Sequence, residues 1–135
     1  MKKTIPIIIA ILFSFSATWA IGEGLSQVSS KGLFQVEMSI PGKILKVGKN
    51  SAEILIRDKD GKVVKGARVT ALPLIFQHGE STLLKPKVTE KTKGRYAIEN
   101  IYIETPGHWV LKITIRKDDK ADIVNFDFPE VKREV

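Results

Sequence analysis

Short stretches in which apolar and polar residues alternate constrain the fold of this chain more than any other feature. The clearest alternation runs over 109–116, WVLKITIR, and similar runs occur at 34–40, 52–57, 67–71 and 124–128. A period of two places alternate side chains on opposite faces of a β-strand, whereas a helix requires a period of 3.6. The sequence therefore predicts a series of strands, each with one face buried.

Turn-forming residues separate these stretches. They are Pro41-Gly42, Asp60-Gly61, Gly66, Pro106-Gly107 and Asp118-Asp119-Lys120. Glycine tolerates the positive φ that many tight turns need, and Asp and Pro favour turn starts. About seven short strands over roughly 100 residues predict an all-β fold, an immunoglobulin-like β-sandwich.

Trp109 is expected in the core, at the centre of the sandwich. A large aromatic residue at the head of a strict alternation is more often a core residue than a ligand platform. His108 precedes it and points to the opposite face of the strand. We therefore expect His108 to be exposed.

The first twenty residues have the composition of a signal peptide. Lys2 and Lys3 precede an apolar stretch, Ile5–Phe15, and Thr18-Trp19-Ala20 suits a signal peptidase. The alternative is an uncleaved membrane anchor, because residues 4–22 contain no charge. The predicted organisation is a signal peptide (1–20), a Gly- and Ser-rich linker (21–32) and a β-sandwich domain (33–131). The sequence thus predicts export to the periplasm or the extracellular side, or a membrane-anchored protein that faces outward.

Composition excludes several classes of site. The chain contains no cysteine, which excludes disulfides, thiolate metal sites and cysteine nucleophiles. Without residues 1–20 it carries 20 basic and 15 acidic residues, a net charge of +5. The basic residues are dispersed and not interleaved with aromatics, so we expect no nucleic-acid binding. Most are expected to be solvated, and attraction to an anionic envelope surface is the second interpretation.

Several segments together resemble YtkA-like domains and, more distantly, FixH-type proteins. They are Val47-Gly48-Lys49-Asn50, Asp60-Gly61-Lys62-Val63, Gly66-Ala67-Arg68-Val69, Gly94-Arg95-Tyr96 and Pro106-Gly107-His108-Trp109. The resemblance covers roughly Leu33 to Phe128. The resemblance implies a small exported sandwich, of a kind found beside heavy-metal efflux and copper-enzyme assembly systems. Family members often carry Met-Pro and His-Gly after the third strand. Here residues 72–79 match at Pro73, His78 and Gly79, without methionine.

The two histidines, His78 and His108, are the candidate metal ligands, with copper as the candidate ion. A competent site needs two to four convergent ligands, and beyond these two histidines the domain has only one methionine and no thiol. The sequence therefore predicts no required cofactor. It also contains no nucleophile elbow, zinc-binding helix motif or phosphate-binding glycine loop, so the protein is predicted not to be an enzyme.

The segment Leu74–Lys93 is the longest one without alternation. It forms either a crossover between the two sheets, with its apolar residues packed beneath it, or a partner-docking loop that stays exposed. The candidate docking residues are Leu74, Ile75, Phe76, His78, Leu83 and Leu84.

Two functions remain open at this stage. The first is an exported, non-enzymatic binding or accessory module of the cell envelope, associated with a metal transport or copper-oxidase assembly system. The second is a structural or adhesive envelope domain with a basic surface and no metal role. In both cases an envelope protein partner is expected, and membrane contact is expected only if residues 1–20 are retained.

Overall fold

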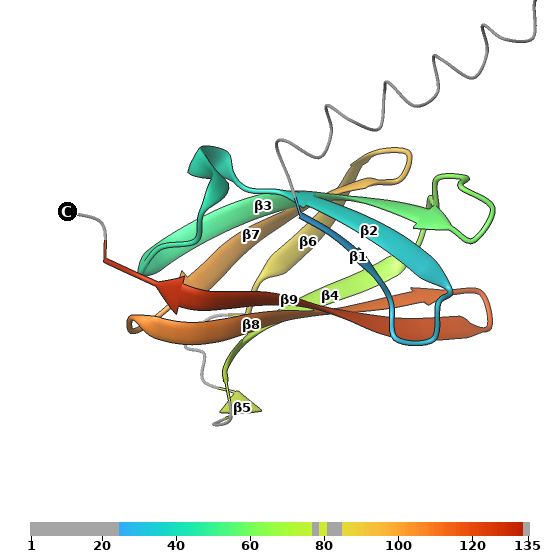
Figure 1. Ribbon diagram of the computed structural model, residues 1–135. Helices are drawn as coiled ribbons and strands as arrows, with labels where there is room; N and C mark the ends of the chain where they lie inside the picture. The colour runs from blue at the N-terminus through green and yellow to red at the C-terminus, as the bar shows by residue number, and fades with distance from the viewer. Residues whose placement is uncertain (1–24, 77–78, 81–84, 134–135) are drawn as a thin grey trace, which may run out of the picture.

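A computed structural model describes residues 25–76, 79–80 and 85–133, which form nine strands in two antiparallel sheets (Figure 1). The predicted signal peptide lies outside these residues. The strands are β1 (Leu25–Val28), β2 (Phe34–Ser39), β3 (Gly48–Asp58), β4 (Arg68–Ile75), β5 (Gly79–Glu80), β6 (Lys87–Thr92), β7 (Arg95–Ile103), β8 (Gly107–Lys117) and β9 (Lys120–Val131), with one 3-10 turn, η1 (Pro41–Lys43).

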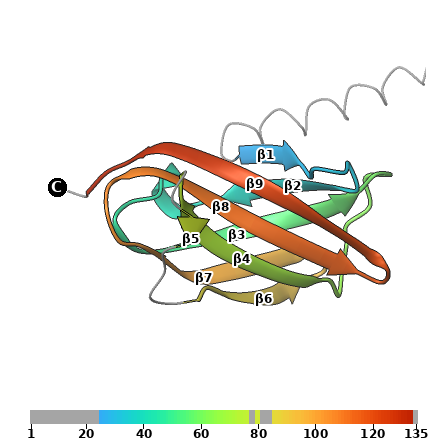
Figure 2. The same cartoon turned by 90° about the horizontal axis from the view of Figure 1, so that it is seen from below.

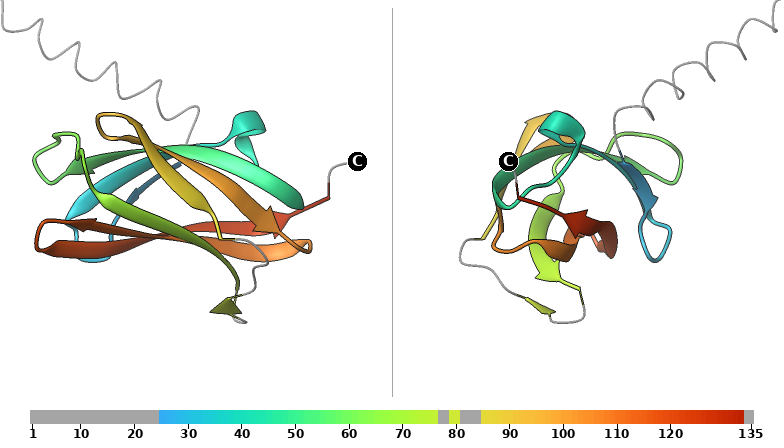
Figure 3. Two further views of the ribbon diagram at one scale, coloured as in Figure 1. Left: turned by 180° about the vertical axis from the view of Figure 1, so that it is seen from behind. Right: turned by 60° about the vertical axis from the view of Figure 1, so that its left-hand side comes forward.

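The two sheets lie face to face as the layers of a sandwich (Figures 2 and 3). One sheet has the order β1-β2-β3-β7-β6 and the other has the order β5-β4-β8-β9. The predicted all-β sandwich is therefore confirmed. The described residues contain nine strands, more than the expected seven or so, because β1, the two-residue β5 and β6 have no apolar alternation that would reveal them.

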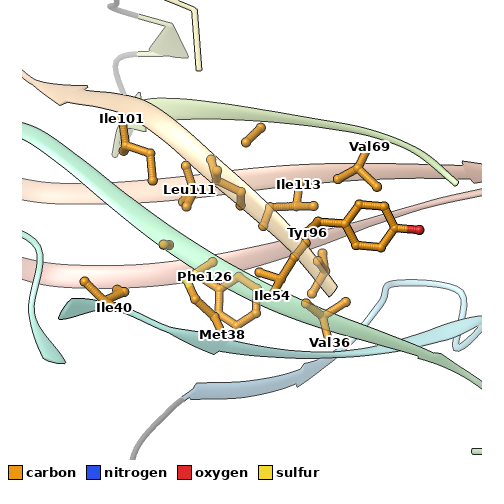
Figure 4. Packing of buried hydrophobic residues seen from close by; sticks show 14 of the residues in the cluster. Val36, Met38, Ile40, Ile54, Val69, Tyr96, Ile101, Leu111, Ile113 and Phe126 are labelled. Carbon is orange, nitrogen blue, oxygen red and sulfur yellow. The ribbon is translucent and has the colours of Figure 1, made fainter. Parts of the chain in front are cut away.

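The inward side chains of both sheets form one hydrophobic core (Figure 4). Val36, Met38 and Ile54 of the five-stranded sheet are at most 1% exposed, as are Ile113 and Phe126 of the other sheet. Each of these residues belongs to one of the predicted alternating sets, so the expected inward faces are correct. Since burial of apolar area is the main stabilising contribution, this alternation determines how the layers pack.

Trp109 is buried as predicted, with 1% of its surface exposed, and its Nε1 donates a hydrogen bond to the Thr105 carbonyl at 2.8 Å. Its position at the centre of the sandwich was predicted wrongly. The strand β8 begins at Gly107, so Trp109 lies near one end of the sheet, opposite Ile75 and Phe128.

The predicted linker over residues 21–32 is wrong from residue 25 onward. Residues Leu25–Val28 form β1, which pairs antiparallel with β2. All four side chains of β1 are exposed, so backbone hydrogen bonds to β2 hold the strand without help from burial. The following turn is also fixed, because the Ser30 amide donates to the Ile123 carbonyl of β9.

The segment Leu74–Lys93 is more regular than expected. Leu74 and Ile75 complete β4, and residues 87–92 form β6. The connection passes from the four-stranded sheet to the five-stranded sheet, which is the crossover that the sequence suggested.

Among the residues described, no helix has the length and apolar character needed to cross a membrane.

Candidate functional site

An exposed aromatic side chain marks the end of β4. The Phe76 amide donates to the His108 carbonyl at 2.9 Å, which extends the β4–β8 pairing by one residue. The Phe76 ring stacks on the His108 imidazole, with ring centroids 4.0 Å apart and an interplanar angle of 13°. Phe76 is nevertheless 43% exposed. The stack therefore presents a large apolar surface to solvent in a fixed orientation.

An acidic residue of the neighbouring strand completes this arrangement. His108 Nε2 and Asp127 Oδ1 lie 2.5 Å apart, and their side chains are 30% and 56% exposed. The pairing of β8 with β9 shifts register between Gly107 and Trp109, next to His108. His108 is therefore half-buried between Phe76 and Asp127, whereas the sequence predicted a simply exposed side chain.

Two apolar side chains and one acid lie beside this stack on the outer face of the four-stranded sheet. Leu74, Val110 and Asp127 lie opposite one another across β4, β8 and β9. A hollow of about 480 Å³ lies along this face. It is lined by the apolar residues Leu74, Ile75, Phe76, Val110 and Ile123 and by the polar residues Ser30, Lys112 and Asn125. We call Leu74, Phe76, His108, Val110 and Asp127 the docking patch.

The predicted docking residues fall into three groups. Phe76 is exposed and Leu74 is half-buried on the outer face, within the docking patch. Ile75 packs against the hydrophobic core and so contributes to stability more than to a surface. The remaining three residues, His78, Leu83 and Leu84, lie outside the described part of the chain.

The described residues do not fit a copper or zinc site. Across residues 25–76, 79–80 and 85–133, no group of three or more His, Cys, Asp or Glu side chains converges. His108 is paired with a single carboxylate, whereas zinc and copper sites use three or four protein donors. The second predicted ligand, His78, lies outside the described residues.

Two buried polar groups serve the fold rather than the patch. The Asp122 carboxylate accepts hydrogen bonds from the Ser29 hydroxyl (2.6 Å) and from the amides of Lys31, Leu33 and Ile123. Burial opposes ionisation of Asp122, but these hydrogen bonds outweigh it and hold its pKa below the ordinary value. It ties the β1–β2 turn to β9.

Tyr96 plays a similar part at the β3–β4 connection. Its hydroxyl donates to the Val64 carbonyl at 2.7 Å and accepts from the Ala67 amide at 3.1 Å. Burial of the hydroxyl raises the pKa of Tyr96.

The buried serine and the patch histidine are too far apart to act together. Ser29 bonds Asp122 and His108 pairs with Asp127, and five residues of extended β9 separate the two acids by about 17 Å. These four residues therefore form two separate pairs and no Ser-His-Asp triad, which requires all three groups within hydrogen-bond reach.

Sequence reasoning missed Asp127 and Val110 as members of the patch. Val110 belongs to the polar-facing set of the clearest alternating strand, and an apolar residue on that face is a signal that could have identified it.

Comparison with known proteins identifies the relatives of this sandwich. A family model described as YtkA-like matches residues 30–114. The fold is similar to that of a DUF4426 family protein from Pseudomonas aeruginosa, with a TM-score of 0.57 and 16% sequence identity over 84% of this chain and 98% of that one. No curated protein matches the sequence significantly.

Proposed function

This chain belongs to the YtkA-like family, and from that premise we propose that it is an exported, non-enzymatic binding or accessory module of the cell envelope. It recognises an envelope protein partner through the docking patch. The observation that carries this proposal is the solvent-exposed Phe76 ring, held by its stack on His108.

The physical argument concerns preorganisation. Interfaces gain most of their affinity from a few aromatic or charged anchors, and affinity rises when an anchor needs no ordering on binding. The backbone bond of Phe76 to His108 and the His108–Asp127 pair already fix this anchor. The apolar hollow beside it offers a place for a partner side chain, because exposed apolar patches mark interaction sites.

The accessory role is proposed without a resident metal. Modules that this chain resembles occur beside copper and heavy-metal systems. Such an association does not require that the domain itself binds a metal ion. The donor set of the described residues does not supply a metal site. A protein partner in such a system is therefore compatible with the proposal, and ion binding is not needed for it.

Export is tested by the mass of the native protein. If residues 1–20 are a cleaved signal peptide, the protein recovered from its host begins near Ile21 or Glu23. Intact-mass spectrometry of envelope and extracellular fractions measures this directly. Recovery of the uncleaved chain in the membrane fraction would instead support the anchored form, and recovery in the cytoplasm would contradict export.

Partner recognition is tested by Phe76→Ser. Loss of an aromatic anchor typically costs about 2 kcal/mol or more, so capture of the cross-linked partner from native envelope should fall about 30-fold. Ile44→Ser is the matched control, because Ile44 is 64% exposed and lies on the β2–β3 connection of the five-stranded sheet, whereas the patch is on the four-stranded sheet. His108→Ala, which removes the ring beneath Phe76, should give an intermediate loss.

Thermal unfolding verifies that all three variants remain folded. A folded Phe76→Ser variant with undiminished capture would contradict recognition through the patch. It would favour the alternative, a structural or adhesive domain that uses its basic surface. In that case reversal of surface charge, and not loss of Phe76, would abolish binding.

A further inference from the structure

Basic side chains collect at the end of the sandwich opposite the docking patch. The turns that follow β1, β3, β6 and β8 all lie at this end (Figures 1 and 3). The pairs that close it are Phe34 with Asp58, Thr92 with Arg95, Arg68 with Arg116, and Lys117 with Lys120. The two layers meet here, since Lys117 Nζ donates to the Lys65 carbonyl at 2.7 Å. We call this region the basic end.

The basic end carries a net charge of +6. Six acidic residues lie there: Asp58, Asp60, Glu90, Asp118, Asp119 and Asp122. Twelve basic residues accompany them: Lys31, Arg57, Lys59, Lys62, Lys65, Arg68, Lys91, Lys93, Arg95, Arg116, Lys117 and Lys120. The other described residues carry eight basic and seven acidic side chains. The positive charge of the domain is therefore almost entirely at one end.

Three of the six acids of the basic end accept hydrogen bonds from backbone amides. Asp58 accepts from the amides of Asp60 and Lys62, and Glu90 accepts from those of Gly66 and Gly94. Asp122 is buried in its own network. Within the described ranges, no lysine or arginine of the basic end forms an ion pair with an acid. The excess of six positive charges at this end is thus left for an external anion.

Repulsion between two arginines destabilises the sheet at this end when no anion is bound. Arg68 of β4 and Arg116 of β8 are directly opposed cross-strand neighbours, and both are exposed. Like charges in opposed positions destabilise a sheet. A guanidinium group binds a phosphate through paired hydrogen bonds, so one anionic group between the two arginines would remove the repulsion.

Apolar side chains accompany the cations. Val28, Gln35, Arg57 and Val63 follow one another in a row across β1, β2, β3 and the β3–β4 connection. Val28 and Val63 at the ends of this row are 61% and 41% exposed. Cations mixed with exposed aliphatic residues suit the headgroup region of a bilayer, where the aliphatic groups reach the acyl boundary.

We propose that the basic end binds the surface of an anionic phospholipid bilayer. The cations project from four separate turns at one end of the molecule, and a planar surface can meet all four at once. This contact needs neither retained residues 1–20 nor the docking patch, and so it departs from the expectation that membrane contact depends on the N-terminal segment. A domain bound in this way presents Phe76 away from the bilayer.

The test is amine footprinting of the full chain, which works whether or not the N-terminus is anchored. The chain is mixed with vesicles of phosphatidylcholine alone or of equimolar phosphatidylcholine and phosphatidylglycerol, and lysine acylation is read by mass spectrometry. Lys59, Lys62 and Lys120 should be protected about fivefold by the anionic vesicles only, and high salt should remove the protection. Lys49, Lys85 and Lys132, away from the basic end, should not change.

Charge reversal gives the matched comparison. In the variant Lys59→Glu/Lys62→Glu/Lys120→Glu, the anionic lipid concentration needed to protect Lys31 and Lys65 should rise about 100-fold, since each lysine contributes about fivefold. The variant Lys49→Glu/Lys85→Glu/Lys132→Glu has the same net charge and should behave like the unchanged chain. Three results would each overturn the lipid assignment. They are equal effects of the two variants, absence of protection by anionic vesicles, and equal protection by soluble polyglutamate. None of these readouts involves the protein partner, so the two proposals fail separately.

Discussion

Trp109→Ala is expected to lower the free energy of unfolding by about 3–5 kcal/mol, the range for deletion of a buried aromatic side chain. Trp109 is 1% exposed and packs within the core that both sheets share. Its removal opens a cavity in the core between the two sheets. The cross-strand neighbours Ile75 and Phe128 belong to strands that cannot collapse into this cavity without breaking their pairing with β8. It also leaves the Thr105 carbonyl without the indole donor.

Two further substitutions separate burial from the other contributions. Trp109→Phe keeps most of the packing and loses the hydrogen bond to Thr105, so we expect it to lower the free energy of unfolding by about 1–2 kcal/mol. His108→Ala, on the opposite face of the same strand, should cost about 1 kcal/mol, because it removes an exposed stack and a weak surface pair. Denaturant unfolding of the three variants measures the series. If His108→Ala destabilised the domain more than Trp109→Ala, the two faces of β8 would have to be exchanged.

Alternation made the strands predictable because burial of one face is a local property. In β8, Leu111, Ile113 and Ile115 are buried at every second position, and the residues between them are more exposed. The same rule identified β2, β3, β4 and β9. It could not identify β1, because all four of its side chains are exposed and its order comes from the backbone of β2.

The candidate site was only partly predictable, since it joins residues that are distant in the sequence. Phe76 and His108 belonged to separate hypotheses, a docking loop and a metal ligand, and the pairing of β4 with β8 brings their rings together. Asp122 shows the same limit. It lies just after the Asp118-Asp119-Lys120 turn, a place where carboxylates often cap amides, but it binds the distant β1–β2 turn, and its partner Ser29 is 93 positions away. The sequence shows that a carboxylate beside a turn tends to cap amides. Only the folded structure shows which turn it caps.

The largest polar effect is expected at this same carboxylate. Asp122→Ala should lower the free energy of unfolding by about 3–4 kcal/mol, because it leaves the Ser29 hydroxyl and several amides without an acceptor in a buried place. Asp122 is 4% exposed, so water cannot easily replace the carboxylate. Asp119→Ala is the control: this acid lies in the exposed β8–β9 turn and should cost less than about 0.5 kcal/mol.

The pH dependence of stability provides an independent measurement of the Asp122 network. The pKa of Asp122 in the folded protein lies below the ordinary value of 3.8, so the unfolded chain binds this proton more readily than the folded one. The stabilisation is therefore fully present above that ordinary value and is lost as the pH falls through the lower, folded pKa. Asp122→Asn retains the shape but cannot ionise, and its amide group faces donors that the carboxylate accepted. The difference in unfolding free energy between the unchanged protein and Asp122→Asn should thus be constant from pH 7 to about 5 and shrink below about pH 4. Denaturant unfolding across this range measures it, and a difference that stayed constant down to pH 2 would show that ionised Asp122 does not hold the β1–β2 turn to β9.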